Sequence, residues 1–116
     1  MDQITYGDFE KLDIRIGTVV KAEVPEWSHW VMKMSVDFGD EVGTKTVFSG
    51  IMKFYSVKDL EGKQFPFVVN LKPKKIGPEK ELSEGMMIMA VPSDDEETPP
   101  ILFQLQSKVA NGTKVR

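Results

Sequence analysis

The stretch "SVKDLEGKQFPFVVNL", residues 56–71, predicts a short helix followed directly by a buried strand. Ser56 is a favourable helix N-cap, Asp59 stands where its carboxylate can cap the first turn, and Gly62 is suited to end the helix. The strand that follows places four apolar residues on one face: Phe65, Phe67, Val69 and Leu71. Pro66 has no N–H, so we expect it to limit strand pairing at its position.

Strand patterns lie on both sides of this unit. Five further segments are rich in β-branched or alternating apolar residues: 13–24, 31–38, 44–50, 85–91 and 101–106. In the first of them, Arg15 points away from the face that Ile14 and Ile16 share, and Gly17 is suited to a bulge or a tight bend.

Two shorter segments complete the expected elements. Residues Thr5 to Leu12 predict a helix, with Thr5 as the N-cap and Asp8 three residues later. Near the C-terminus, Asn111-Gly112 is a turn signal.

The order of these elements predicts the fold. A helix between the third and fourth of five strands is the layout of the oligonucleotide/oligosaccharide-binding (OB) fold. We therefore expect an all-β protein, a five-stranded OB-fold barrel with a short helix between strands 3 and 4, a short N-terminal helix and extra strands near the C-terminus. A length of 116 residues suits a single domain, residues 1–116.

The net charge of −3 combines two regions of opposite sign. From Lys63 to Lys80 there are five lysines and one acid, a local balance of +4, whereas residues 94–97 are all acidic within a proline-bounded loop. The low total charge argues against a strongly basic, sequence-blind nucleic-acid binder. The lysines at 72, 74 and 75 therefore form either a solvated turn or a rigidly held group for an anionic partner.

Several kinds of chemistry lack the residues they need. His29 is the only histidine and there is no cysteine, which excludes thiol catalysis, disulfides and cysteine-bound zinc. The acids show no recognised metal-ligand spacing, and no glycine loop could cradle a phosphate. We expect a protein that is not an enzyme and has neither a metal site nor a cofactor.

The sequence also carries no membrane signal. No apolar run approaches the roughly 18 residues of a membrane-spanning helix. The first thirteen residues lack the basic start and apolar stretch of a signal peptide. We expect a soluble, cytoplasmic protein with no membrane partner.

Four segments together resemble the tRNA-binding domain family: "FEKLDIRIGTVVKAE" (9–23), "SGIMKFYSVKDLEGKQ" (49–64), "VVNLKPKKI" (68–76) and "SEGMMIMA" (83–90). They occur in the order seen in that family. Its OB domain is found at the C-terminus of methionyl-tRNA synthetases, in free-standing tRNA-binding proteins and in CsaA-type export chaperones. Two loops differ from the family pattern. "VPEWSHWVMKM" (24–34) lacks the usual His-Pro-Asp-Ala-Asp-Lys-Leu, and "KKIGPEKELSEG" (74–85) is longer than the usual turn or built differently.

The resemblance implies an RNA-binding face made by Arg15, Lys53, Asn70, Lys72, Lys74, Lys75 and Ser83. Pro73 restricts the backbone between the lysines, so less entropy is lost when they contact phosphates. Asn70 would contact RNA or hydrogen-bond its own turn. For Arg15, pairing with an acid and lining the ligand face are both open.

Trp27 and Trp30 fall in the loop after the first strand, one of the two loops by which OB folds hold oligonucleotides. Each would either stack on a base, at about 1–3 kcal/mol, or pack on the barrel or in a dimer interface.

Three functions follow from the resemblance. The first is non-catalytic recognition of tRNA shape and backbone, free-standing or auxiliary to methionyl-tRNA synthetase. The alternative is a CsaA-like chaperone that binds unfolded polypeptides in protein export, and a third possibility is an assembly module. The family also implies a homodimer, and the apolar strand at 101–106 would need a cover.

Overall fold

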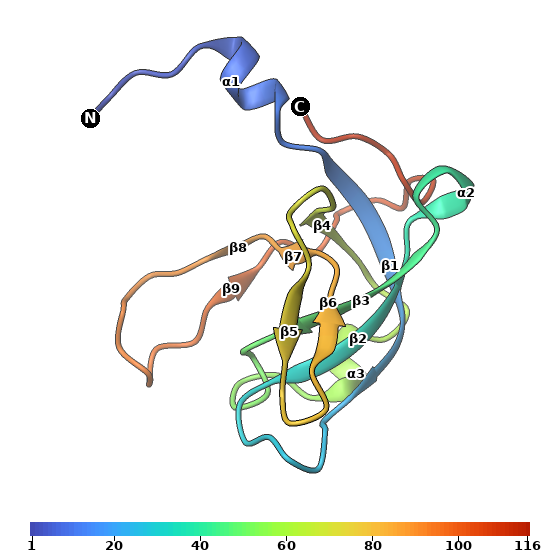
Figure 1. Cartoon of the computed structure of the whole chain (residues 1–116), viewed down its shortest axis with the longest axis vertical. Helices are drawn as coiled ribbons and strands as arrows, with labels where there is room; N and C mark the ends of the chain where they lie inside the picture. The colour runs from blue at the N-terminus through green and yellow to red at the C-terminus, as the bar shows by residue number, and fades with distance from the viewer.

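The computed structural model describes residues 1–116, and strands dominate it (Figure 1). Its helices are short: α1 (Tyr6–Glu10), α2 (Gly39–Val42) and α3 (Val57–Leu60). The strands are β1 (Ile14–Glu23), β2 (Met32–Asp37), β3 (Thr44–Ser49), β4 (Gln64–Val68), β5 (Lys74–Ile76), β6 (Glu81–Ser83), β7 (Met86–Met87), β8 (Met89–Ala90) and β9 (Ile101–Leu102).

Local capping explains two of the helices. The Thr5 hydroxyl accepts a hydrogen bond from the Asp8 N–H at 3.1 Å, and the Asp8 carboxylate accepts one from the Thr5 N–H. At α3 the Asp59 carboxylate accepts from the Ser56 N–H at 2.8 Å. These bonds lower the pKa of both aspartates. Both helices were predicted from the capping residues, and both are confirmed.

Five strands form a nearly closed antiparallel barrel in the order β3-β2-β1-β4-β7. The long strand β1 pairs with β4 through its first half and with β2 through its second half. The barrel closes where the Glu84 N–H donates to the Thr46 carbonyl oxygen at 2.8 Å, which joins the start of β7 to β3. Helix α3 lies between β3 and β4 in the chain, so the predicted OB fold is confirmed.

Gly17 has a different role from the predicted bulge. The register of β1 shifts between Val19 and Lys21, beyond Gly17. A Cβ at Gly17 would lie 2.5 Å from the Val36 side chain and 2.6 Å from the Phe38 ring. The glycine therefore lets β1 approach its neighbours closely, and the bulge forms further along the strand.

The core fills the barrel from the inner faces of these strands. Met32, Met34, Val36 and Phe38 are all buried, as their alternation predicted. Phe38 packs edge-on against Phe67 of β4, with ring centroids 5.3 Å apart. Strand β4 ends at Val68, however, and Leu71 is exposed, so the predicted apolar face of this strand is shorter than the sequence suggested.

Pro66 limits the ladder as predicted. Its carbonyl oxygen accepts from the Ile88 N–H at 3.1 Å, but it has no N–H to return the bond. The strand predicted at 85–91 is accordingly split next to Pro66, at Ile88, into β7 and β8. The strand predicted at 101–106 is also shorter than expected, and only β9 forms. Strands β8 and β9 pair with each other and project from the barrel as an arm, with the acidic loop at its end (Figure 1).

The C-terminal segment returns to the barrel after the predicted turn at Asn111-Gly112, where Gly112 has φ +88°. It runs beside the first half of β1, where the Ile16 N–H donates to Thr113 and the Val115 N–H donates to Ile14. None of the helices is long and apolar enough to cross a membrane.

Candidate nucleic-acid interface

The two OB binding loops are identified by the strand order. The barrel strands follow the chain as β1, β2, β3, β4 and β7, so the loop between the first and second comprises residues 24–31. The loop between the fourth and fifth comprises residues 69–85 and contains the hairpin β5–β6. OB folds use these two loops to hold oligonucleotides. The lysine-rich segment noticed in the sequence therefore belongs to an OB ligand loop.

The loop of residues 69–85 presents four lysines to solvent, three of them on the hairpin. Lys72, Lys74, Lys75 and Lys80 are all exposed, and none of them forms an ion pair. Lys80, at the tip, has φ +54° and was not among the predicted binding residues. The only sequence feature that points to Lys80 is the excess of lysine in residues 63–80, to which it belongs.

These lysines do not all point the same way. Lys74 is opposite Ser83 in the hairpin, and Lys75 is opposite Leu82. Because successive side chains on a strand alternate between its faces, Lys74 and Lys75 lie on opposite faces of the hairpin. The positive charge surrounds the hairpin and does not form a one-sided ridge.

Ser83 and its neighbour attach the hairpin to the barrel. The Ser83 hydroxyl accepts from the Phe48 N–H at 3.1 Å and donates to the Gly85 carbonyl oxygen. The Glu84 carboxylate accepts from the Thr46 N–H at 3.1 Å. The Ser83 hydroxyl is thus hydrogen-bonded within the protein and attaches β6 of the hairpin to β3.

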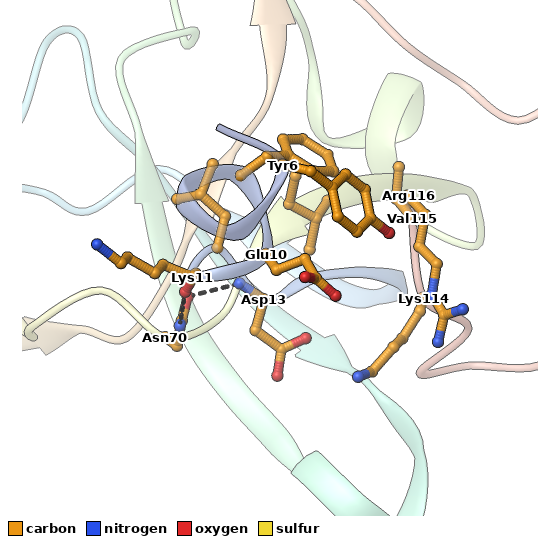
Figure 2. A pocket seen from close by; sticks show the side chains of 11 residues that line it. Tyr6, Glu10, Lys11, Asp13, Asn70, Lys114, Val115 and Arg116 are labelled. Atoms are coloured by element: carbon orange, nitrogen blue, oxygen red, sulfur yellow. Dashed lines mark hydrogen bonds between the residues drawn. The ribbon is translucent and has the colours of Figure 1, made fainter. Parts of the chain in front are cut away.

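Asn70 links the segments that flank two neighbouring strands, β1 and β4. Its side-chain oxygen accepts from the Asp13 N–H at 2.8 Å, and its amide nitrogen donates to the Lys11 carbonyl oxygen at 2.7 Å (Figure 2). The side-chain amide therefore joins the chain before β1 to the chain after β4. This fixes the start of the segment that leads to the lysines.

A cavity of about 370 Å³ lies beside Asn70, between α1 and the C-terminal segment. Figure 2 shows Lys11, Lys114 and Arg116 around it, together with Glu10 and Asp13. No pattern in the sequence marks Lys11, Lys114 and Arg116 as neighbours. They come from opposite ends of the chain, and only the pairing of the C-terminal segment with β1 brings them together.

Arg15 is buried and paired. Its guanidinium donates to Asp13 at 2.7 Å, to Glu41 at 3.2 Å and to the Gly112 carbonyl oxygen at 3.1 Å. The hydrogen bonds to Asp13 and then Glu41 raise the pKa of Arg15, and the same contact lowers the pKa of Glu41. Of the two predicted roles, the structure therefore places Arg15 in an ion pair with acids.

Trp27 and Trp30 lie in different surroundings. Trp27 is half-buried between Phe48 and the hairpin tip, with 6.4 Å between the Trp27 and Phe48 ring centroids. Trp30 is 61% exposed and lines a cavity of about 560 Å³ beneath the acidic loop. Lys53 lies at the same cavity, where its ammonium donates to the Glu96 carbonyl oxygen at 3.0 Å. Lys53 is therefore held by the acidic loop and not by the hairpin.

The acidic loop is ordered by one of its own side chains. The Asp95 carboxylate accepts hydrogen bonds from Ser93, Glu97 and Thr98, which lower its pKa to about 2. No group of three or more His, Cys, Asp or Glu side chains is arranged to hold a metal ion.

The barrel and α3 define an OB-fold domain. Residues 14–114 match the family model described as "Putative tRNA binding domain". The chain belongs to this tRNA-binding domain family, which confirms the resemblance seen in the sequence.

Both synthetase-related proteins and chaperones are similar to this chain. The methionine–tRNA ligase of Clostridium perfringens is 37% identical over 115 residues, which are 99% of this chain but only 17% of the ligase. The MetRS-related protein from Pyrococcus horikoshii superposes with a TM-score of 0.86 at 34% identity, and the match covers 100% of both chains. The chaperone CsaA from Bacillus anthracis superposes with a TM-score of 0.83 at 35% identity, over 99% of this chain and 100% of the other.

Proposed function

We propose that this protein binds tRNA through the hairpin β5–β6 and performs no catalytic step. The observation that carries the proposal is the set of exposed, unpaired lysines on an OB ligand loop. Membership of the tRNA-binding domain family supports it. Lysines such as these contact phosphates, so the protein would recognise the shape and backbone of tRNA more than its base edges.

The proposed contact group is Lys72, Lys74, Lys75 and Lys80. Asn70 and Ser83 act by holding the hairpin in place, because their polar atoms are already hydrogen-bonded. Arg15 and Lys53 are left outside the contact group for the same reason. The proposed contact group is therefore smaller than the RNA-binding face that the resemblance implied.

A second function, chaperone-like binding of unfolded polypeptide, is favoured by a different observation. The hydrophobic residues that line the cavity under the acidic loop are Trp30, Phe54, Met89 and Val91. Asp94 and Glu96 line the same cavity. An apolar cavity bordered by acids suits an apolar peptide with basic residues and repels phosphates. The likeness to CsaA supports this alternative.

One pair of titrations separates the two functions. The protein is titrated with total tRNA and, separately, with an unfolded peptide, each at 50 and at 200 mM salt (about a fourfold range). If tRNA is the ligand, its affinity falls steeply with salt because phosphate contacts release counterions. If polypeptide binds and tRNA does not, the chaperone function is the correct one.

The protein should act as a cytoplasmic homodimer, either alone or in association with methionyl-tRNA synthetase. Exposed apolar residues on α1 and at both chain ends, among them Ile4, Tyr6 and Val115, support self-association, as does the short uncovered edge strand β9. Sedimentation at micromolar concentration is expected to show a species of twice 13.1 kDa. A 13.1 kDa species alone would exclude the homodimer.

A further inference from the structure

The two loops that differ from the family pattern are in contact with each other. Trp27 belongs to the loop between β1 and β2, and Gly77 lies at the tip of the hairpin β5–β6. In Figure 1 the hairpin descends across the front of the barrel and its tip reaches the level of that loop. The tryptophan and the longer turn are therefore two parts of one arrangement.

The contact leaves no room for a larger residue at the tip. A Cβ at Gly77 would lie 2.5 Å from Cζ2 of Trp27 and 2.7 Å from Cε2. Gly77 also has φ +75°, a conformation that favours glycine. The Trp27 ring also lies near Phe48, with 6.4 Å between the ring centroids, and the Phe48 N–H donates to the Ser83 hydroxyl of the hairpin. The indole thus fills the space between the barrel wall and the hairpin.

An ion pair supports the same contact from β2. The Lys33 ammonium lies 2.6 Å from the Glu81 carboxylate, and both side chains are largely shielded from water. Glu81 is opposite Ile76 in the hairpin, and Ile76 is half-buried. The face of β5–β6 that carries Lys74, Ile76, Glu81 and Ser83 is therefore turned to the barrel, whereas Lys75 and Leu82 point outward. Lys74 is nevertheless exposed at the start of β5.

We propose that Trp27 is a positioning residue for RNA binding: its ring, wedged against Gly77 and Phe48, holds the lysine hairpin in its binding position before tRNA arrives. The inference rests on the proposed function and adds a mechanism to it. Trp27 acts through the hairpin and not through a base, because its half-buried ring already contacts the tip at Gly77.

Positioning has a signature that phosphate contact and base stacking lack. A loosened hairpin must be ordered at the moment of binding, which lowers affinity, but the same lysines still reach the same phosphates. The affinity therefore falls at every salt concentration, and the slope of log affinity against log salt stays constant. Removal of lysines, by contrast, flattens that slope.

The experiment uses two variants that disturb the contact from its two sides. Trp27→Ala removes the ring, and Gly77→Ala leaves the ring but forces the tip away from it. Gly62→Ala is the matched control, because Gly62 has φ +80° and nothing within 4 Å of an added Cβ. Amide hydrogen exchange of residues 74–83 is measured without RNA, and tRNA affinity is then measured at several salt concentrations.

Both hairpin variants are expected to increase exchange at 74–83 and to weaken tRNA binding about tenfold with an unchanged salt slope, a loss of about 1.4 kcal/mol. Gly62→Ala should match the parent in both measurements. If Trp27→Ala weakens binding while Gly77→Ala does not, the ring stacks on RNA and positioning is excluded. Unchanged exchange in both variants would also overturn the inference. If the parent does not bind tRNA, the proposed function fails, while the exchange data still decide whether Trp27 holds the hairpin.

Discussion

Arg15 offers a sharp test of how the structure assigns roles to its cations. The sequence left open whether Arg15 lines the ligand face or pairs with an acid, and the structure buries its side chain to 7% exposure among acids and a carbonyl oxygen. We predict that Arg15→Met reduces the stability of the fold and leaves RNA binding by the folded protein intact. Methionine keeps the apolar length of the side chain and removes only its charge and hydrogen bonds.

The size of the loss follows from the three partners. Breaking a fully buried ion pair costs about 3–5 kcal/mol, but Glu41 is 79% exposed and remains solvated, so it contributes little to the loss. Asp13 is 32% exposed, and a hydrogen bond to a charged group contributes about 1.5–3 kcal/mol. The bond to the Gly112 carbonyl oxygen adds about 0.5–1.5 kcal/mol. We expect a loss of about 2–4 kcal/mol, which is smaller than the stability of a typical domain, about 5–15 kcal/mol.

Urea unfolding followed by circular dichroism measures this loss, and Lys21→Met is the control. Lys21 is an exposed cation on the same strand without an ion pair, so its replacement should change stability by no more than about 0.5 kcal/mol. The tRNA affinity and salt slope of Arg15→Met are then measured where the variant is folded. The structural assignment of Arg15 would be refuted by a variant that is as stable as the parent but whose slope of log tRNA affinity against log salt is flatter by one phosphate contact, about 0.7–0.9.

Three further predictions concern other parts of the chain. Because the pKa of Asp95 is lower in the folded loop than in the unfolded chain, its stabilisation is complete above about pH 4 and disappears as the pH falls through about 2. Carbon-13 titration of its carboxyl should therefore give a midpoint near 2, and a midpoint near 4 would contradict the loop's hydrogen bonds. Gly17→Ala should lower the free energy of unfolding by about 1–3 kcal/mol, because its methyl group would overlap Val36 and Phe38. Lys53→Gln should leave the tRNA salt slope unchanged, and a decrease of about 0.7–0.9 would return Lys53 to the contact group.

The parts of the fold that depend on local chemistry were predictable from the sequence. The capping residues at 5–8 and 56–59 act within one helical turn, and the alternation at 31–38 records burial directly. Pro66 also acts locally, and its effect on the ladder was foreseen. The lengths of the later strands were not predictable in this way. Strand β7 ends next to Pro66 of β4, which lacks an N–H, and the chain leaves the barrel there.

The candidate site was predictable in composition but not in geometry. The lysine excess and the OB loop that carries it could be read from the order of residues. The partners of Arg15 could not, because Glu41 and Gly112 are distant in sequence and reach it only through the fold. The same holds for the contact between Trp27 and Gly77, which joins two loops fifty residues apart.

The central claim is that the hairpin lysines bind tRNA phosphates, and the salt dependence of the Lys72→Gln/Lys74→Gln/Lys75→Gln variant tests it most directly. Each phosphate contact contributes about 0.7–0.9 to the slope of log affinity against log salt, so this variant should flatten the slope by about two to three units. The effect should be the same for every tRNA, because phosphate contacts carry no sequence information. A triple variant that is folded and binds tRNA with the parent's affinity and slope would contradict the claim and leave these lysines as a solvated surface.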